Sequence, residues 1–180
     1  MVFDSGFVFN IVVWITSLPG SELGPSRRMT EDMEALAGQY KFQLISLELY
    51  NVRQLSAALE DLAIHASIDG WRPILVLDMH GKKDRGLMMA SGEDVSWECL
   101  SNYFTKVNIA TGNNLCIIGA ACFTFHAIQA VHINQPTPFF MLIAPEARVN
   151  VGFLLDNIVK FFSSLFVTGS ITAAFTHIGM

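Results

Sequence analysis

The stretch CIIGAACFTFH, residues 116–126, joins an uncharged run to a cysteine and places a histidine four residues later. Its first part is short and apolar, as is typical of a buried strand in a parallel sheet. Cys122 stands where that strand would end. The stretch therefore poses two questions: which sheet contains the strand, and whether the Cys122 thiol is a core side chain or a reactive group.

Further runs along the chain predict strands of the same sheet, with helical segments between them. The predicted strands are 9–16, 42–50, 73–79, 115–121 and 138–144, with 42–50 nearer the sheet edge, a hairpin over 86–95 and a candidate last strand at 171–175. Five helices are predicted. The first follows a loop at 17–29 and has Thr30 as its N-cap, the second covers 53–66, and the third begins near Trp97. The fourth covers 123–131, and the fifth covers 151–166 with Asn150 as its N-cap. This alternation predicts a doubly wound, mostly parallel α/β sheet of about five to six strands with helices on both faces, in one domain of residues 1–180.

The composition narrows the classes of function. Hydrophobic residues make up 52% of the chain and charged residues 15%, which excludes a disordered chain and favours elements buried on two faces. A net charge of −5 with scattered basic residues gives no footprint for nucleic acid. Three cysteines and a start without a basic signal region favour a reducing cytoplasm. The apolar runs 115–133 and 151–167 are interrupted by polar or charged residues, so no membrane span is expected.

A histidine and a cysteine follow two of the predicted strands directly. His80 comes after 73–79 and Cys122 after 115–121. In parallel sheets the ends of neighbouring strands lie about 5 Å apart, and functional groups gather at the carboxyl ends. A nearby imidazole, and the start of a helix after Cys122, would stabilise a thiolate. Gly81 has no side chain, so its N–H and that of Cys122 would form an oxyanion hole.

The segments VLDMHG, residues 76–81, and GAAC, residues 119–122, carry a family resemblance. Their order, with a hairpin and a helix between them, resembles the caspase-like (clan CD) cysteine peptidases and is most similar to the prokaryotic CHAT branch, over nearly the whole chain. The histidine lies 42 residues before the cysteine, against about 50 in the caspase pattern.

The resemblance implies a cysteine endopeptidase without a cofactor or a third triad member. In it Cys122 would attack a peptide carbonyl to form an acyl-enzyme, and His80 would serve as general acid and base. The resemblance also implies a protein or peptide substrate, a regulatory protein partner or a larger sensor complex, and a role in bacterial defence or cell death.

Two positions depart from the family pattern. Phe125 stands where relatives commonly have glycine, three residues after the cysteine, which would narrow the cleft or mark an inactive copy. Ala120 stands two residues before the cysteine, where relatives selective for charged residues carry Asp or Gln. Nothing at that position selects a charged substrate residue. The loops 17–25 and 145–150 are expected to line the substrate pocket, with Glu22, Glu146 and Arg148 as its charges.

Several alternatives stay open at this point. A catalytically inactive caspase-like fold would act as an interaction or scaffold module. A flavodoxin-like domain would bind an anion or nucleotide, but the sequence has no Gly-rich phosphate loop. His126 offers Cys122 a different partner or half of a metal site, although the other histidines, His65, His132 and His177, lack ligand spacing, so no metal is expected. Cys99 and Cys116 are interpreted as structural, and the wide apolar stripe of 151–166 allows a homo-oligomer interface.

Overall fold

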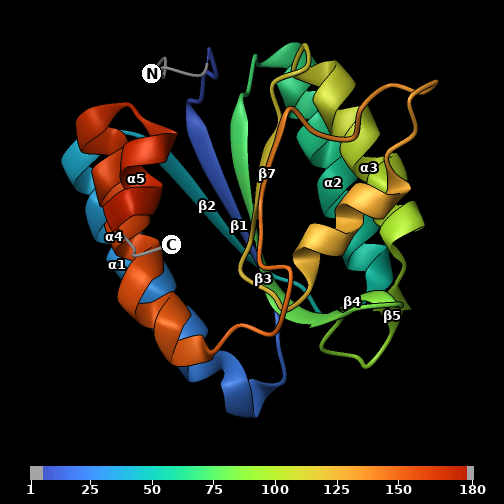
Figure 1. The fold of residues 1–180 in the computed structure, drawn as a ribbon, viewed down its shortest axis with the longest axis horizontal. Helices are drawn as coiled ribbons and strands as arrows, with labels where there is room; N and C mark the ends of the chain where they lie inside the picture. Colours follow the sequence, from blue (N-terminus) through green and yellow to red (C-terminus); the bar gives the residue numbers. More distant parts are fainter. Residues whose placement is uncertain (1–5, 178–180) are drawn as a thin grey trace.

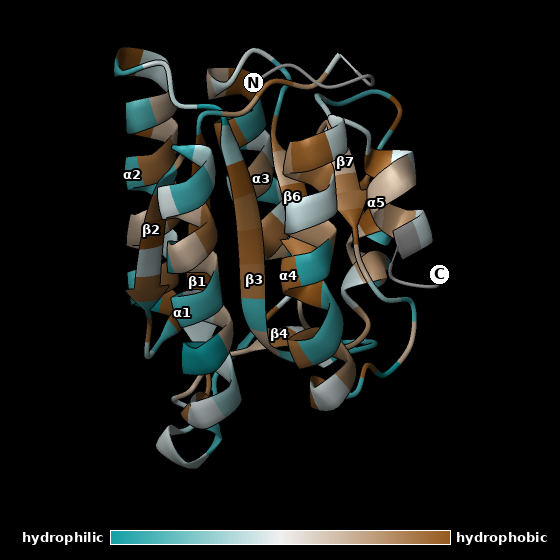
Figure 2. Cartoon of the chain, turned by 90° about the vertical axis from the view of Figure 1, so that its left-hand side faces the viewer, coloured by the Kyte–Doolittle hydropathy of each residue, from teal (hydrophilic) through white to brown (hydrophobic). Residues whose placement is uncertain are grey.

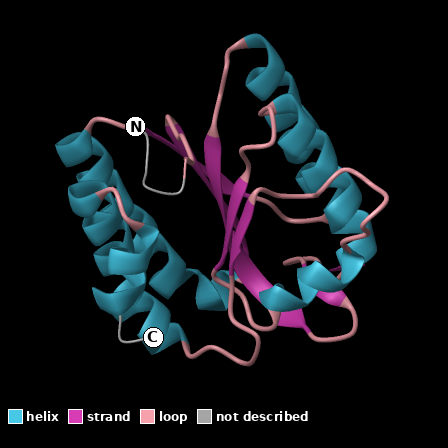
Figure 3. Cartoon of the chain, turned by 45° about the horizontal axis from the view of Figure 1, so that its top comes forward, coloured by secondary structure: helices cyan, strands magenta, loops and turns pink. Residues whose placement is uncertain are grey.

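The computed structural model describes residues 6–177, which form one sheet between two layers of helices (Figure 1, Figure 3). Five parallel strands lie in the order β2-β1-β3-β6-β7. They are β1 (Ile11–Ser17), β2 (Gln43–Glu48), β3 (Pro73–Lys82), β6 (Cys116–Gly119) and β7 (Met141–Ile143). The predicted class, an open and mostly parallel α/β sheet, is confirmed.

A short hairpin extends this sheet from the end of β3. Its strands β4 (Gly86–Met88) and β5 (Asp94–Val95) run antiparallel and bring the sheet to seven strands in the described part of the chain. The sequence predicts this hairpin over 86–95, and its paired part is shorter. The prediction that 42–50 lies near the sheet edge is also confirmed, because β2 pairs with β1 alone among the described strands.

Helices cover both faces of the sheet. One face carries α2 (Val52–Ile68) and α3 (Trp97–Ala110), and the other carries α1 (Leu23–Tyr40), α4 (Val151–Thr168) and α5 (Ile171–His177) (Figure 1). Two 3-10 helices, η1 (Gly20–Glu22) and η2 (Thr124–Ala130), lie beyond the ends of β1 and β6. The Asn150 N-cap is confirmed, since its side chain accepts a hydrogen bond from Gly152 N–H at 2.7 Å.

The central strands separate two apolar cores. In β1, Val13 and Ile15 face the α2–α3 layer, whereas Val12 and Trp14 face the α1–α4 layer. All of β1 is buried, as expected of an inner parallel strand. β3 is hydrophobic along most of its length and becomes hydrophilic at its lower end, where it leaves the core (Figure 2). The polar groups of interest lie at that end.

The helix α1 begins earlier than the sequence predicts. It starts at Leu23, so Thr30 is not its N-cap but an interior residue whose hydroxyl donates to the Arg27 carbonyl at 2.9 Å. Pro25, which the sequence places in a loop, lies in the first turn, where backbone N–H groups have no helical partner and proline is tolerated. The predicted loop at 17–29 is therefore mostly helical.

The segment 171–175 is helical, not a last strand. Gly169 ends α4 in the left-handed conformation, with φ of 66°, and the Ser170 hydroxyl then accepts a hydrogen bond from Ala173 N–H at 3.3 Å. The resulting α5 packs on α4 through Phe161 and Phe175, whose ring centroids are 5.5 Å apart. Contacts between the helices thus decide the conformation of this segment.

Within the described residues, α4 is the one helix long and apolar enough to cross a membrane, by length and composition alone. In the fold it covers a face of the sheet, with Ile158, Phe162 and Phe166 buried in the core beside α1. Its apolar stripe therefore has a core-packing role.

Candidate active site

Strands β3 and β6 bring His80 and Cys122 to the same edge of the sheet. The parallel register pairs Leu77 with Gly119, and Ala120 N–H donates to the Leu77 carbonyl at 2.9 Å. His80 and Cys122 each come three residues after the paired residues. Beyond this pair the chain leaves β6, and the backbones of Gly81 and Cys122 come into contact. The expectation that these two strands are neighbours is confirmed.

Gly81 packs against the backbone of Cys122. A Cβ at this position would lie 2.8 Å from the Cys122 carbonyl carbon and would overlap its oxygen, so only glycine fits. Gly81 and His80 belong to β3 itself, which ends at Lys82 and not at Met79, because residues 80–82 pair with β4. The hairpin therefore holds this end of β3 against Cys122.

One cavity of about 330 Å³ is lined by His80, Cys122, Ala120 and Glu22 together. Its other walls come from η1, the first turns of α1 and α4, and the ends of β3 and β6: Leu18, Ser21, Pro25, Ser26, Met29, Asp78, Met79, Ala121, Val149, Val151 and Leu154. Ala120 is buried and contributes only a methyl group. We call this space the His80–Cys122 cavity.

Glu22 forms an ion pair with His80. Its Oε2 lies 2.8 Å from His80 Nε2, and the two side chains are 49% and 40% exposed. Glu22 ends η1 and is the N-cap of α1, so a 3-10 turn stands where the sequence predicts a loop, and it directs the carboxylate toward β3. A half-exposed ion pair adds little stability, but it fixes the orientation of the imidazole.

Backbone groups surround the sulfur of Cys122. Val149 N–H donates to Cys122 Sγ at 3.4 Å, and the thiol donates to the Val149 carbonyl at 3.8 Å. The sequence predicts a helix over 123–131 that would direct its first N–H groups at the thiol, but this segment is the short 3-10 helix η2. In the described part of the chain, no residue accepts a hydrogen bond from Cys122 N–H, so this N–H can donate to a ligand.

The chain turns sharply directly after Cys122. Phe123 has φ of 60° and ψ of 14°, the left-handed conformation that bulky side chains rarely adopt. It is held there by hydrogen bonds to the loop after β7: Phe123 N–H donates to the Ala147 carbonyl and Phe125 N–H to the Pro145 carbonyl, both at 3.1 Å. Such strain persists where the surroundings enforce it, often at functional sites.

Asp78 is a residue of this cavity that sequence reasoning missed. It is 4% exposed, and its Oδ2 accepts hydrogen bonds from Ser26, from Trp14 Nε1 at 3.3 Å and from Thr16 at 3.5 Å. Burial raises the pKa of Asp78 above 3.8, and these hydrogen bonds and the charge of His80 oppose the rise. The sequence DMH, residues 78–80, contains a signal for Asp78, because residues 78 and 80 of one strand face the same side.

The raised pKa of Asp78 predicts a pH-dependent stability. Between its ordinary and its raised pKa, the folded protein keeps a proton that the unfolded chain releases, so the free energy of unfolding falls as pH rises through this window. Asp78→Asn removes this pH dependence, so we expect the variant to gain stability relative to wild type as pH rises. Urea unfolding over a pH series measures the difference.

Asp94→Asn is the control with the opposite sign. The Lys82 ammonium, 2.7 Å away, donates a hydrogen bond that lowers the pKa of Asp94, so its contribution to stability is lost as pH falls. This variant should lose stability relative to wild type at neutral pH and approach it in acid. If the free energy of unfolding changed with pH in the same way in Asp78→Asn and in wild type, Asp78 would not be the source of this pH dependence.

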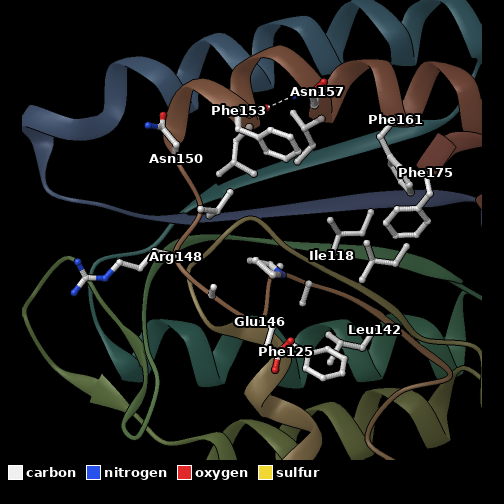
Figure 4. A pocket seen from close by; sticks show the side chains of 18 residues that line it. Ile118, Phe125, Leu142, Glu146, Arg148, Asn150, Phe153, Asn157, Phe161 and Phe175 are labelled. Carbon is white, nitrogen blue, oxygen red and sulfur yellow. Dashed lines mark hydrogen bonds between the residues drawn. The ribbon is translucent and has the colours of Figure 1, made fainter. Parts of the chain in front are cut away.

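A second, apolar cavity of about 610 Å³ lies between β6, β7 and the helices α4 and α5 (Figure 4). We call it the α4 pocket; it is lined by Ile118, Gly119, Phe125, Leu142, Ile143, Ala144, Pro145, Glu146, Ala147, Arg148, Val149, Asn150, Phe153, Leu154, Asn157, Ile158, Phe161 and Phe175. Glu146 and Arg148, predicted for the same pocket as Glu22, lie here instead. Phe125 also lines this pocket and is not among the residues that line the His80–Cys122 cavity.

Cys99, Cys116 and His126 do not line the His80–Cys122 cavity, and the side chain of His177 lies outside the described part of the chain. Cys116 is buried in β6, and burial raises its pKa to about 12. Cys99 is half-buried in α3. His126 Nδ1 lies 2.9 Å from Gln129 Nε2, so its ring is oriented by its own helix. Among residues 6–177, no group of three or more His, Cys, Asp or Glu side chains could hold a metal ion.

The fold and the site define an α/β protein with a histidine and a cysteine at the ends of neighbouring parallel strands. No protein-family model matches the chain, and no curated protein matches it.

Proposed function

We propose that this chain is a cysteine peptidase with a caspase-like fold, in which Cys122 is the nucleophile and His80 the general acid and base. The observation that carries the proposal is the close packing of Gly81 on the Cys122 backbone, at the end of two strands in register. His80, the residue before Gly81, and Cys122 both line one cavity. The resemblance of VLDMHG and GAAC to caspase-like peptidases supports the same roles.

The proposed reaction uses the groups around Cys122 in turn. His80 takes the thiol proton, and the sulfur attacks the carbonyl carbon of the scissile peptide bond. The N–H groups of Gly81 and Cys122 stabilise the resulting oxyanion. When the C–N bond breaks, His80 returns the proton to the leaving amine. Water then hydrolyses the thioester with His80 as base, which releases the carboxylic acid and restores the thiol.

A peptide carrying an electrophilic ketone tests the proposal. We expect one covalent adduct, mapped by mass spectrometry to Cys122, that is absent in Cys122→Ala and forms at least about 100-fold more slowly in His80→Ala. Cys99→Ala is the matched control and should label as wild type does. If Cys122 reacts no faster than Cys99, or if His80→Ala labels normally, the chain is instead a non-catalytic module that binds a partner.

The family resemblance adds to the proposal how the peptidase is activated and in which system it acts. A regulatory partner or a larger sensor complex would activate the peptidase, in a bacterial defence or cell-death system.

The departure at Phe125 does not weigh against activity, because Phe125 lines the α4 pocket rather than the cavity of His80 and Cys122.

Glu22 is predicted to be a positioning residue for His80. Its carboxylate holds His80 Nε2 at 2.8 Å and would stabilise the imidazolium formed during the reaction. Glu22→Gln should lower kcat/KM by about 10- to 100-fold, mainly through kcat, with little change in stability. Glu34→Gln, on an exposed position of α1, is the matched control. Unchanged kinetics in Glu22→Gln would show that the ion pair has no part in the reaction.

A further inference from the structure

The walls of the α4 pocket are mostly apolar, and its two charged residues are exposed. Figure 4 shows the rings of Phe125, Phe153, Phe161 and Phe175 around the cavity, while the Arg148 side chain points away from them. Glu146 and Arg148 are exposed. Its volume of about 610 Å³ falls within the range of about 300–1,000 Å³ that is typical of ligand pockets. The part of a ligand that enters this pocket must therefore be apolar.

The α4 pocket and the His80–Cys122 cavity share part of their walls. Val149 and Leu154 line both spaces, and Val149 N–H is the group that donates to Cys122 Sγ. A molecule whose carbonyl carbon lies at the sulfur is therefore next to a residue, Val149, that also lines the α4 pocket. The shared wall is also fixed in place, because the loop after β7 accepts hydrogen bonds from Phe123 and Phe125 N–H.

The asparagine side chains of the α4 pocket are hydrogen-bonded within α4. The Asn150 side chain caps α4 by accepting from Gly152 N–H, and Asn157 Nδ2 donates to the Phe153 carbonyl at 2.9 Å. These amides have partners within α4 itself. A ligand would therefore gain affinity here from buried apolar area rather than from hydrogen bonds.

We propose that the α4 pocket binds a large apolar side chain, aromatic or branched aliphatic, of the peptide that is cleaved at Cys122. This inference rests on the proposed peptidase function and names its substrate class. The apolar side chain enters between β7 and α4 while the scissile carbonyl lies at Cys122 Sγ. The pocket thus supplies selectivity that Ala120, with its methyl group, does not.

Fluorogenic peptides in which one Phe or Leu is moved along the positions on either side of the cleaved bond test the inference. At one position, the apolar residue should raise kcat/KM by about 10- to 100-fold over Ala or Ser. Ala144→Phe, which adds a ring to the pocket wall, should reduce this preference at least about tenfold. Ala35→Phe, on the exposed face of α1, is the matched control.

Phe125→Ala provides a second variant, because Phe125 is 38% exposed and its removal leaves the core intact. It should weaken the same preference, while labelling of Cys122 by the small reagent iodoacetamide stays at the wild-type rate in the Ala35→Phe control. Hydrolysis without any apolar preference, or a preference that both variants leave unchanged, would overturn the inference.

Calorimetry with the Cys122→Ala protein separates this inference from the proposed function. The preferred Phe- or Leu-containing peptide should bind, and Ala144→Phe in the same background should abolish binding. If wild type neither hydrolyses nor labels but this binding pattern holds, the pocket assignment stands and the peptidase proposal fails. If peptides are hydrolysed but the Cys122→Ala protein binds Ala- and Phe-containing peptides equally, the pocket assignment is wrong.

Discussion

Replacing Cys122 by alanine is expected to abolish peptide hydrolysis, with kcat lowered at least about 10⁴-fold. The variant loses the sulfur that Val149 N–H contacts at 3.4 Å, and no other described thiol lines the cavity with His80. His80→Ala should cause a loss of similar size, because nucleophile and base act as one unit and their effects do not add. Release of a fluorophore from a peptide mixture, in single and double variants, measures these losses.

The control for this prediction is Cys99→Ala, which should retain wild-type turnover. Cys116 is a less suitable control because it is fully buried in β6 and its replacement would disturb the sheet. Melting temperatures of all variants show whether any loss reflects unfolding. Residual hydrolysis in Cys122→Ala, or losses that multiply in the double variant, would mean that Cys122 and His80 do not form a catalytic pair.

The sequence predicts this pair because both residues directly follow runs that are predicted to be inner strands. An uncharged run such as 115–121 identifies a buried parallel strand, and the residue that follows it leaves the sheet at the functional edge. The structure adds the register, with Leu77 opposite Gly119. Register depends on contacts between strands, which a single sequence does not contain. The sequence therefore predicts His80 and Cys122 at one edge of the sheet, and the structure is needed to show that they line the same cavity.

Other parts of the site depend on long-range contacts that local patterns do not encode. Glu22 reaches His80 only because η1 and α1 continue the chain past the end of β1, and the glycine and proline there favour a loop prediction. Phe123 adopts its left-handed conformation because the loop after β7 binds its N–H. Local sequence does not single out Asp78, because its partners come from β1 and α1.

The sequence also predicts the wrong element for a short segment, because the contact that decides its conformation is with another helix. The run 171–175 is apolar enough for a strand, but it lies beyond the Gly169 turn and packs on α4, so it forms a helix. A run of this length satisfies both periodicities, and only its packing partner decides between them. The long and strongly periodic α4 was predicted well, and its Asn150 cap adds a local signal that needs no distant contact.

Gly81→Ala is expected to damage both stability and activity. The added Cβ would overlap the Cys122 carbonyl oxygen and lie 2.8 Å from its carbon, so the end of β3 must separate from the segment after β6. Overpacking of this kind lowers the free energy of unfolding by about 1–3 kcal/mol. A displacement of about 1 Å between His80 and Cys122 should lower kcat/KM by about 100-fold or more. Urea unfolding and hydrolysis assays measure the two effects.

Gly38→Ala distinguishes the contact of Gly81 from a general effect of replacing glycine. Gly38 lies on an exposed position of α1, where an added Cβ meets nothing within 4 Å, so the helix should gain about 0.5–1 kcal/mol. The informative result is a Gly81→Ala protein that stays folded at low temperature and yet labels slowly at Cys122. Wild-type labelling and hydrolysis in that variant would mean that the Gly81–Cys122 contact does not hold the two reactive side chains in place. The proposed function would then no longer be supported by this contact.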